Sequence, residues 1–205
     1  MNLKTIIFIG KSASGKGTQV EKLIEYINKV DEKKRLCFHL ESGNRFRAFI
    51  QENNYSSLLS KKISEEGGLQ PEFLSIWAWT GEMIANLERH THLIIDGAPR
   101  RILEAKILDS ALDFYDRNEV EIIYLNVSDE WAIDLMHKRR RADDIKDHDI
   151  LSRLNWFKMN VSPVLDYFRA HKSFKFNEIN GEQPIEQVHQ DILKALDLDK
   201  ELDEL

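Results

Sequence analysis

The residues best suited to chemistry lie near the N-terminus, in a glycine-rich segment. Gly10 is followed by Gly15 and Lys16 in the pattern G-x-x-x-x-G-K, after the apolar run 5–9 and before a stretch with helical spacing. Glycines let backbone N–H groups point at phosphate oxygens, and the next helix adds its positive end. A lysine here reaches the β and γ oxygens. The segment predicts a triphosphate site, against the alternative of a simple turn. The expected contacts are Gly10, Ala13, Ser14, Gly15, Lys16, Gly17 and Thr18.

Two further segments carry arginines that can hold a second phosphate. They are 42–47, which ends in Arg47, and 96–100, which ends in Arg100. A guanidinium fork fits a phosphate better than an ammonium group does. Asp96 directly follows an apolar run, where a carboxylate can order water around Mg²⁺. Taken alone, Arg47 would more often be a solvated helix residue, so residue types by themselves make these arginines candidates only.

A dense basic cluster occupies 138–141, and two aspartates follow it at 143 and 144. Such a run of charges is often a solvated or nucleic-acid-binding face. A phosphotransferase gives it another use, because its transition state spreads negative charge over the moving phosphate. Arginines stabilise that charge and exclude water. We favour this second interpretation.

The elements that position these residues follow from the apolar pattern. Short β-branched runs predict strands, and stretches with helical spacing, such as 20–27 and 102–112, separate them. The alternation predicts an α/β fold of βαβ units with a parallel sheet, in which ligands bind beyond the carboxyl ends of the strands. The predicted strands are 5–9, 36–40, 93–95, 122–125 and 174–179.

Together these segments resemble the adenylate kinase family of nucleoside monophosphate kinases. Residues 15–19, Gly-Lys-Gly-Thr-Gln, are similar to its phosphate loop, and 42–47 to its S-T-G-D-x-x-R. Residues 67–72 look like its G-x-x-x-P, and 96–100 are very like its D-G-F-P-R. The basic cluster matches the family's R-x-D-D, and Arg153 its R-L, one residue late. The likeness covers nearly the whole chain.

The resemblance implies a three-layer P-loop NTPase fold with a five-stranded parallel sheet, a helical insertion that binds the monophosphate (NMP), and a short lid. The core would comprise 1–41, 72–138 and 150–205, the NMP-binding insertion 42–71 and the lid 139–149. A lid of this length has no room for a zinc-binding insertion, and the single cysteine agrees with that.

The resemblance also implies roles for individual residues. It makes Mg²⁺, held through ATP phosphates and water near Thr18 and Asp96, the expected cofactor. The expected catalytic residues are Lys16, Arg100, Arg139, Arg141 and Arg153. The expected acceptor contacts are Ser42, Gly43, Arg47, Leu69, Gly97, Arg100 and Glu104.

Some positions depart from the family pattern. Leu135 stands where many members have an arginine that stacks on the ATP adenine. Either backbone contacts near 180–184, including Gln183, hold the donor base, or donor selectivity is loose. Ala98 replaces a phenylalanine, and Asn44 replaces an aspartate of the acceptor pocket.

Glu104 is the most informative departure, because adenylate kinases place a base-reading glutamine there. An ionised carboxylate only accepts hydrogen bonds, so it suits guanine, whose edge offers two donors, better than adenine. A mismatched buried polar pair costs about 1–3 kcal/mol. The alternative is that Glu104 turns outward and pairs with Arg101. We expect AMP as the default acceptor, with GMP or another monophosphate possible.

Composition bounds these expectations. The chain has 205 residues, 42% of them hydrophobic, and a net charge of −6, which does not favour polymeric nucleic acid as a partner. The lone Cys37 and the short apolar N-terminal run predict a cytoplasmic protein. We expect a monomer whose partners are ATP and a monophosphate, with no membrane partner. Two alternatives stay open: a catalytically idle nucleotide sensor on the same fold, and a P-loop kinase for a small non-nucleotide metabolite.

Overall fold

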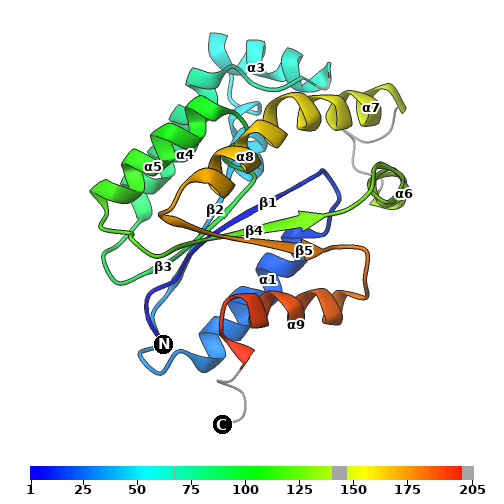
Figure 1. The fold of residues 1–205 in the computed structure, drawn as a ribbon. Coiled ribbons are helices and arrows are strands. Elements are labelled where there is room, and N and C mark those ends of the chain that lie inside the picture. The colour runs from blue at the N-terminus through cyan, green and yellow to red at the C-terminus, as the bar shows by residue number, and fades with distance from the viewer. Residues whose placement is uncertain (67, 140–146, 200–205) are drawn as a thin grey trace.

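A parallel sheet forms the centre of the computed structural model, which describes residues 1–66, 68–139 and 147–199. Its strands are β1 Thr5–Gly10, β2 Cys37–Glu41, β3 His92–Asp96, β4 Val120–Asn126 and β5 Phe174–Asn180. They lie in the order β2-β3-β1-β4-β5, so β1 occupies the middle (Figure 1). The fold is thus the predicted α/β fold with five parallel strands, as in P-loop NTPases.

Helices surround this sheet, and some of them cover its two faces. The α-helices are α1 Lys16–Val30, α2 Ser42–Phe49, α3 Tyr55–Glu65, α4 Glu72–Asn86, α5 Ile102–Phe114, α6 Asp129–Arg139, α7 Asp147–Trp156, α8 Ser162–Ala170 and α9 Ile185–Ala195. α1 and α9 pack on one face, and α4, α5 and α8 pack on the other, which gives three layers (Figure 1). No helix in the described ranges is long and apolar enough to cross a membrane.

The core explains why β1 is apolar from Ile6 to Ile9. Ile6 and Phe8 point toward α1 and α9, while Ile7 and Ile9 point toward α4, α5 and α8. All four side chains are buried. A strand covered on both faces has no position for a polar side chain, so its sequence is a continuous hydrophobic run rather than an alternating one.

Two helices, α2 and α3, lie between β2 and α4, within the predicted NMP-binding insertion. α2 contacts α4 through Phe49, whose ring centroid is 5.2 Å from that of Trp77. Arg45 lies over the same indole at 4.9 Å. Asn54 begins α3 with a capping box, in which its side chain accepts from the Ser57 backbone. This cap explains the break between the two helices.

Candidate active site

The glycine-rich segment forms a tight loop between the end of β1 and the start of α1. Gly15 precedes the helix with φ 89°, a left-handed conformation that glycine adopts without strain. A Cβ atom at Gly10 would lie 2.6 Å from Ser14 Oγ and 2.9 Å from the Leu125 carbonyl oxygen. The loop therefore closes against β4 only because position 10 has no side chain.

Lys16 folds back across this loop. Its Nζ donates hydrogen bonds to the carbonyl oxygens of Gly10 at 2.9 Å and Lys11 at 2.8 Å. The Ser14 hydroxyl lies 3.4 Å from the same ammonium group. The side chain is thus positioned to attract phosphate oxygens.

A second lysine fixes the same loop to the neighbouring segment. Lys11 Nζ donates to the Val127 carbonyl at 2.8 Å and pairs with Asp129, the first residue of α6, at 2.5 Å. Sequence analysis missed this contact. The lysine precedes the pattern's key lysine, and nothing in the chain order signals that Val127 and Asp129 lie beside it.

The Gly97 carbonyl joins the ends of β2 and β3. It accepts a hydrogen bond from Ser42 Oγ at 2.8 Å and another from Arg100 Nε at 2.7 Å. Gly97 has φ 84°, and a Cβ there would lie 2.8 Å from Ser42 Oγ. The structure therefore brings Ser42, Gly97 and Arg100 together.

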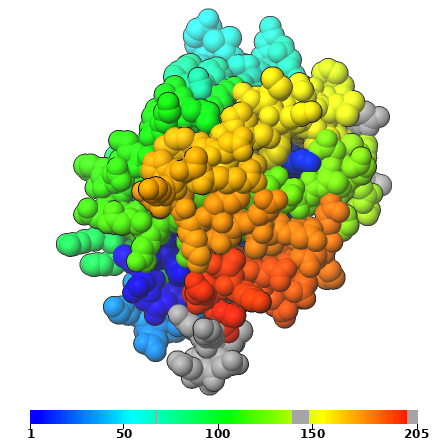
Figure 2. Space-filling model, viewed as in Figure 1, coloured from blue at the N-terminus to red at the C-terminus, as the bar shows by residue number. Residues whose placement is uncertain are grey.

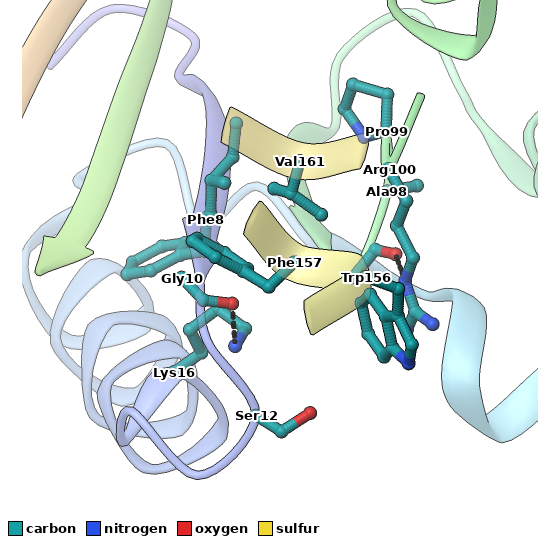
Figure 3. A pocket seen from close by; sticks show the side chains of 12 residues that line it. Phe8, Gly10, Ser12, Lys16, Ala98, Pro99, Arg100, Trp156, Phe157 and Val161 are labelled. Atoms are coloured by element: carbon teal, nitrogen blue, oxygen red, sulfur yellow. Dashed lines mark hydrogen bonds between the residues drawn. The ribbon is translucent and has the colours of Figure 1, made fainter. Parts of the chain in front are cut away.

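One small cavity connects the phosphate loop with Arg100. Its volume is about 50 Å³, and Lys16 and Arg100 both line it, together with Ser12, Trp156 and Phe157 (Figure 3). In the space-filling view, dark blue atoms from the N-terminal part of the chain are visible in a hollow between α6 and α7 (Figure 2). The aromatic pair was not anticipated from the sequence.

Arg47 lies outside the lining of this cavity. Its guanidinium donates to Glu41 Oε1 at 2.7 Å and also hydrogen-bonds the Asn44 side chain. The Arg47 side chain is 51% exposed. The structure thus places Arg47 in the last turn of α2, paired with the final residue of β2, and does not join it to Arg100.

Charges of both signs surround Arg100. Burial lowers the pKa of Arg100, and the positive charge of Arg153 acts in the same direction, while the carboxylates of Glu104 and Asp96 oppose both effects. Two guanidinium groups from different elements, the segment after β3 and α7, therefore act on the same region. A phosphate group there would be attracted by both guanidinium groups and repelled by the two carboxylates.

Glu104 points inward. Only 2% of the residue is exposed, and Oε2 accepts from the Arg100 backbone N–H at 3.2 Å. Oε1 is buried and has no hydrogen-bond partner among the described residues. Burial raises the pKa of this carboxyl. Arg101 instead donates to the Gln70 carbonyl at 2.7 Å, so the outward Glu104–Arg101 pair is not the arrangement found.

The other predicted residues are placed to different degrees. Leu69 is half-buried beside Gln70, and Arg139 ends α6. The Gln183 side chain donates to the Asn180 carbonyl and to Asp191, so its amide is engaged within the protein. Arg141 and most of the predicted lid, 140–146, lie outside the described residues.

Metal binding by protein ligands alone finds no support in the described ranges, where no group of three or more His, Cys, Asp or Glu side chains could hold an ion. Asp96 ends β3 in register with Phe8 of β1, half-buried beside the phosphate loop. Thr18 is exposed in the first turn of α1. One carboxylate and one hydroxyl suit a magnesium ion that takes its remaining ligands from phosphates and water.

Comparison with known proteins agrees with this geometry. The family model for adenylate kinase matches residues 8–173. The adenylate kinase of Flavobacterium psychrophilum is 28% identical over 89% of this chain and 93% of its own length. That of Fusobacterium nucleatum is 27% identical over 96% and 99%, and adenylate kinase 1 of a Nostoc species 25% over 93% and 97%. The chain therefore belongs to the adenylate kinase family of ATP-dependent phosphotransferases.

Proposed function

We propose that the protein transfers the γ-phosphate of ATP to a nucleoside monophosphate, with AMP as the default acceptor. The observation that carries this proposal is the single cavity lined by both Lys16 of the phosphate loop and Arg100 after β3. A donor phosphate at the loop and an acceptor phosphate at Arg100 would meet across it. The relatives named adenylate kinase support AMP as the first acceptor to test.

In the proposed mechanism the chain contributes positioning and charge. Loop N–H groups and Lys16 bind the donor phosphates, and Arg100 binds the acceptor phosphate. The arginines of the predicted lid and Arg153 would stabilise the charge of the transferring group and exclude water. Mg²⁺, coordinated by ATP phosphates and water near Thr18 and Asp96, supplies further neutralisation when bound. A protein general base is not required.

The acceptor base would be selected partly by Glu104. In its ionised form the carboxylate accepts only and suits guanine N1–H and N2–H₂. In its neutral form it donates through O–H and accepts through C=O, as a glutamine amide does, and so suits adenine. The raised pKa of this buried carboxyl increases the share of the neutral form. We therefore propose a broader acceptor range than strict AMP.

A coupled ADP-release assay tests the proposal. Purified protein with ATP and Mg²⁺ is given AMP, GMP, CMP, UMP and their deoxy forms in turn. We expect turnover with AMP, and measurable turnover with GMP. Lys16→Met should lower kcat at least about 100-fold, because it removes a charge that stabilises the transferring phosphate.

The exposed Lys33→Met is the matched control, since it removes a lysine far from the loop and should leave kcat unchanged. Folded wild-type protein that turns over none of these acceptors would contradict the proposal. That result would favour an idle nucleotide-binding protein, and turnover of a non-nucleotide acceptor alone would favour the other P-loop kinase class.

A further inference from the structure

We propose that Trp156 is a positioning residue that aims the Arg100 guanidinium at the acceptor phosphate. This inference rests on the proposed function. The Arg100 Cζ atom lies 5.6 Å from the centroid of the Trp156 ring. Figure 3 shows the indole beside the guanidinium, at the edge of the cavity that Lys16 also lines.

Arg100 is held at two points. Its Nε donates to the Gly97 carbonyl at 2.7 Å, and the guanidinium lies over the indole. The hydrogen bond fixes the base of the planar group, and the ring restricts its rotation. Neither contact uses the outer guanidinium nitrogens. These nitrogens therefore stay available for two parallel hydrogen bonds to a phosphate.

A neutral aromatic partner suits this task better than a carboxylate. A π face attracts a cation through its quadrupole but carries no net charge. Within the described ranges, no carboxylate lies at ion-pair distance from Arg100, whereas Arg47 is paired with Glu41 at 2.7 Å. A carboxylate competes with the incoming phosphate for the same guanidinium. An indole holds Arg100 without that competition.

The helix after the predicted lid explains why Trp156 faces the cavity. Residues Phe157–Val161 form a π-helical turn between α7 and α8, and the Ser162 N–H donates to the Phe157 carbonyl, five residues back. In a π-helical turn, residue i+5 lies nearly above residue i. In an α-helix, residue i+5 would instead lie on a different side of the helix axis from residue i. Trp156 and Val161 therefore share a face, and both line the cavity with Phe157.

The test compares variants that keep or remove the aromatic ring. Trp156→Phe keeps a π face but loses the indole N–H, and Trp156→Met keeps bulk but loses the π face. We expect Trp156→Met to raise the KM for the acceptor about 3- to 30-fold, while Trp156→Phe changes it less than about 3-fold. The KM for ATP should stay within about 2-fold in both variants, because Trp156 is proposed to position Arg100 and not the phosphate loop that binds ATP.

Trp77→Leu removes an indole that lies against another arginine, Arg45. Because Trp77 also packs on α2 of the predicted insertion, the matched control that should leave both KM values unchanged is Phe176→Leu, which removes a ring lying 4.7 Å from Arg169 outside the cavity lining. A raised acceptor KM in Trp77→Leu would instead report on α2. Thermal unfolding of each variant monitors folding. Should Trp156→Met not fold, Trp156→Tyr and Trp156→Leu provide the same comparison of an aromatic with an aliphatic side chain.

The outcomes separate the two proposals. Wild-type turnover combined with an unchanged acceptor KM in Trp156→Met overturns the positioning role alone. An equal rise in both KM values, or a rise in Trp156→Phe as large as in Trp156→Met, also overturns it, since the effect would then be general or would come from the indole N–H. Absence of wild-type turnover with every monophosphate overturns the proposed function, and this inference with it.

Discussion

Cations near the site differ in what holds them. Lys16 and Arg100 both donate hydrogen bonds to main-chain carbonyls. Arg47 is held by the Glu41 carboxylate, which would compete with a phosphate for the same guanidinium group. Main-chain oxygens are supplied by the fold and cannot be inferred from residue types, so the sequence identifies these cations but not their partners.

The Glu41–Arg47 pair leads to the first prediction. Glu41→Gln removes the competing charge while keeping a side chain of the same size, so the acceptor phosphate should bind Arg47 more readily. Because Arg47 is half exposed, the gain is small: we expect the acceptor KM to fall about 1.5- to 5-fold, with the KM for ATP unchanged. Steady-state kinetics measure both values. Glu52→Gln, an exposed substitution on the same segment, is the control, and an unchanged or higher acceptor KM in Glu41→Gln contradicts the prediction.

The buried carboxyl of Glu104 leads to a prediction on pH. Burial raises its pKa above the ordinary 4.5, so the unfolded state loses this proton at lower pH than the folded state does. Stability is therefore lost as pH rises from 4.5 toward the folded-state pKa. Relative to the wild type, Glu104→Gln should become more stable over that window, by up to about 1.4 kcal/mol per pH unit. Urea unfolding at several pH values measures the difference.

The same titration should affect acceptor choice. As pH rises and Glu104 ionises, the ratio of kcat/KM for AMP to that for GMP should fall in the wild type. In Glu104→Gln, which does not titrate there, the ratio should favour AMP and stay flat. A wild-type ratio that is independent of pH, or one that follows the same course in both proteins, contradicts the role of Glu104 in base selection.

At the scale of elements, the sequence predicts the strands better than the turns between helices. Each predicted strand corresponds to an observed strand within two residues at either end. For β1, β3 and β4 the reason is that continuous apolar runs have few other solutions in a covered sheet. The π-turn over Phe157–Val161 was not predicted, since its residues fit an α-helix equally well. Trp156 and Phe157 therefore escaped notice as lining residues, although the phosphate loop and the 96–100 segment were identified.

The phosphate loop offers a prediction at this scale. Gly10→Ala should destabilise the protein by about 1–3 kcal/mol, because the added Cβ meets Ser14 Oγ and the Leu125 carbonyl. Gly17→Ala is the matched comparison: nothing lies within 4 Å of its added Cβ, and the residue lies in the first turn of α1. Alanine there should be neutral or stabilise by up to about 1 kcal/mol. Urea unfolding measures both, and equal stabilities of the two variants would contradict the account.

At the scale of the whole molecule, different kinds of polar residues gather at the carboxyl ends and at the amino ends of the strands. The carboxyl edge holds Gly10, Glu41 and Asp96 at the ends of the three strands β1, β2 and β3. Near the amino ends lies a buried polar cluster, in which Asp31 pairs with Arg35 at 2.6 Å and lies 3.5 Å from His92, the first residue of β3. The sequence gives no motif for this cluster, because its members meet only once the sheet has formed.

This cluster predicts how global stability depends on pH. Burial lowers the pKa of His92 below the ordinary 6.5, and the charge of Arg35 acts in the same direction. The unfolded state therefore takes up a proton near pH 6.5 that the folded state resists, and stability falls as pH drops below 6.5, by up to about 1.4 kcal/mol per pH unit.

His92→Gln should flatten that dependence between pH 7 and pH 5, whatever it does to stability at pH 7. The exposed His90→Gln is the control and should keep the wild-type slope. Urea unfolding across this range measures the slopes. The same slope in wild type and His92→Gln would show that other groups cause the loss of stability in acid.

The single oxygen of Gly97 has a mechanical consequence. It accepts hydrogen bonds from Ser42 in the first turn of α2 and from Arg100 in the segment after β3, so both of its lone pairs are used. If α2 moves and the Ser42–Gly97 hydrogen bond persists, the 97–100 segment must move with it. If the bond breaks, the Gly97 carbonyl that holds Arg100 is less firmly fixed. The Ser42–Gly97 hydrogen bond joins positions 55 residues apart in the chain, so the two parts of the predicted acceptor site move together.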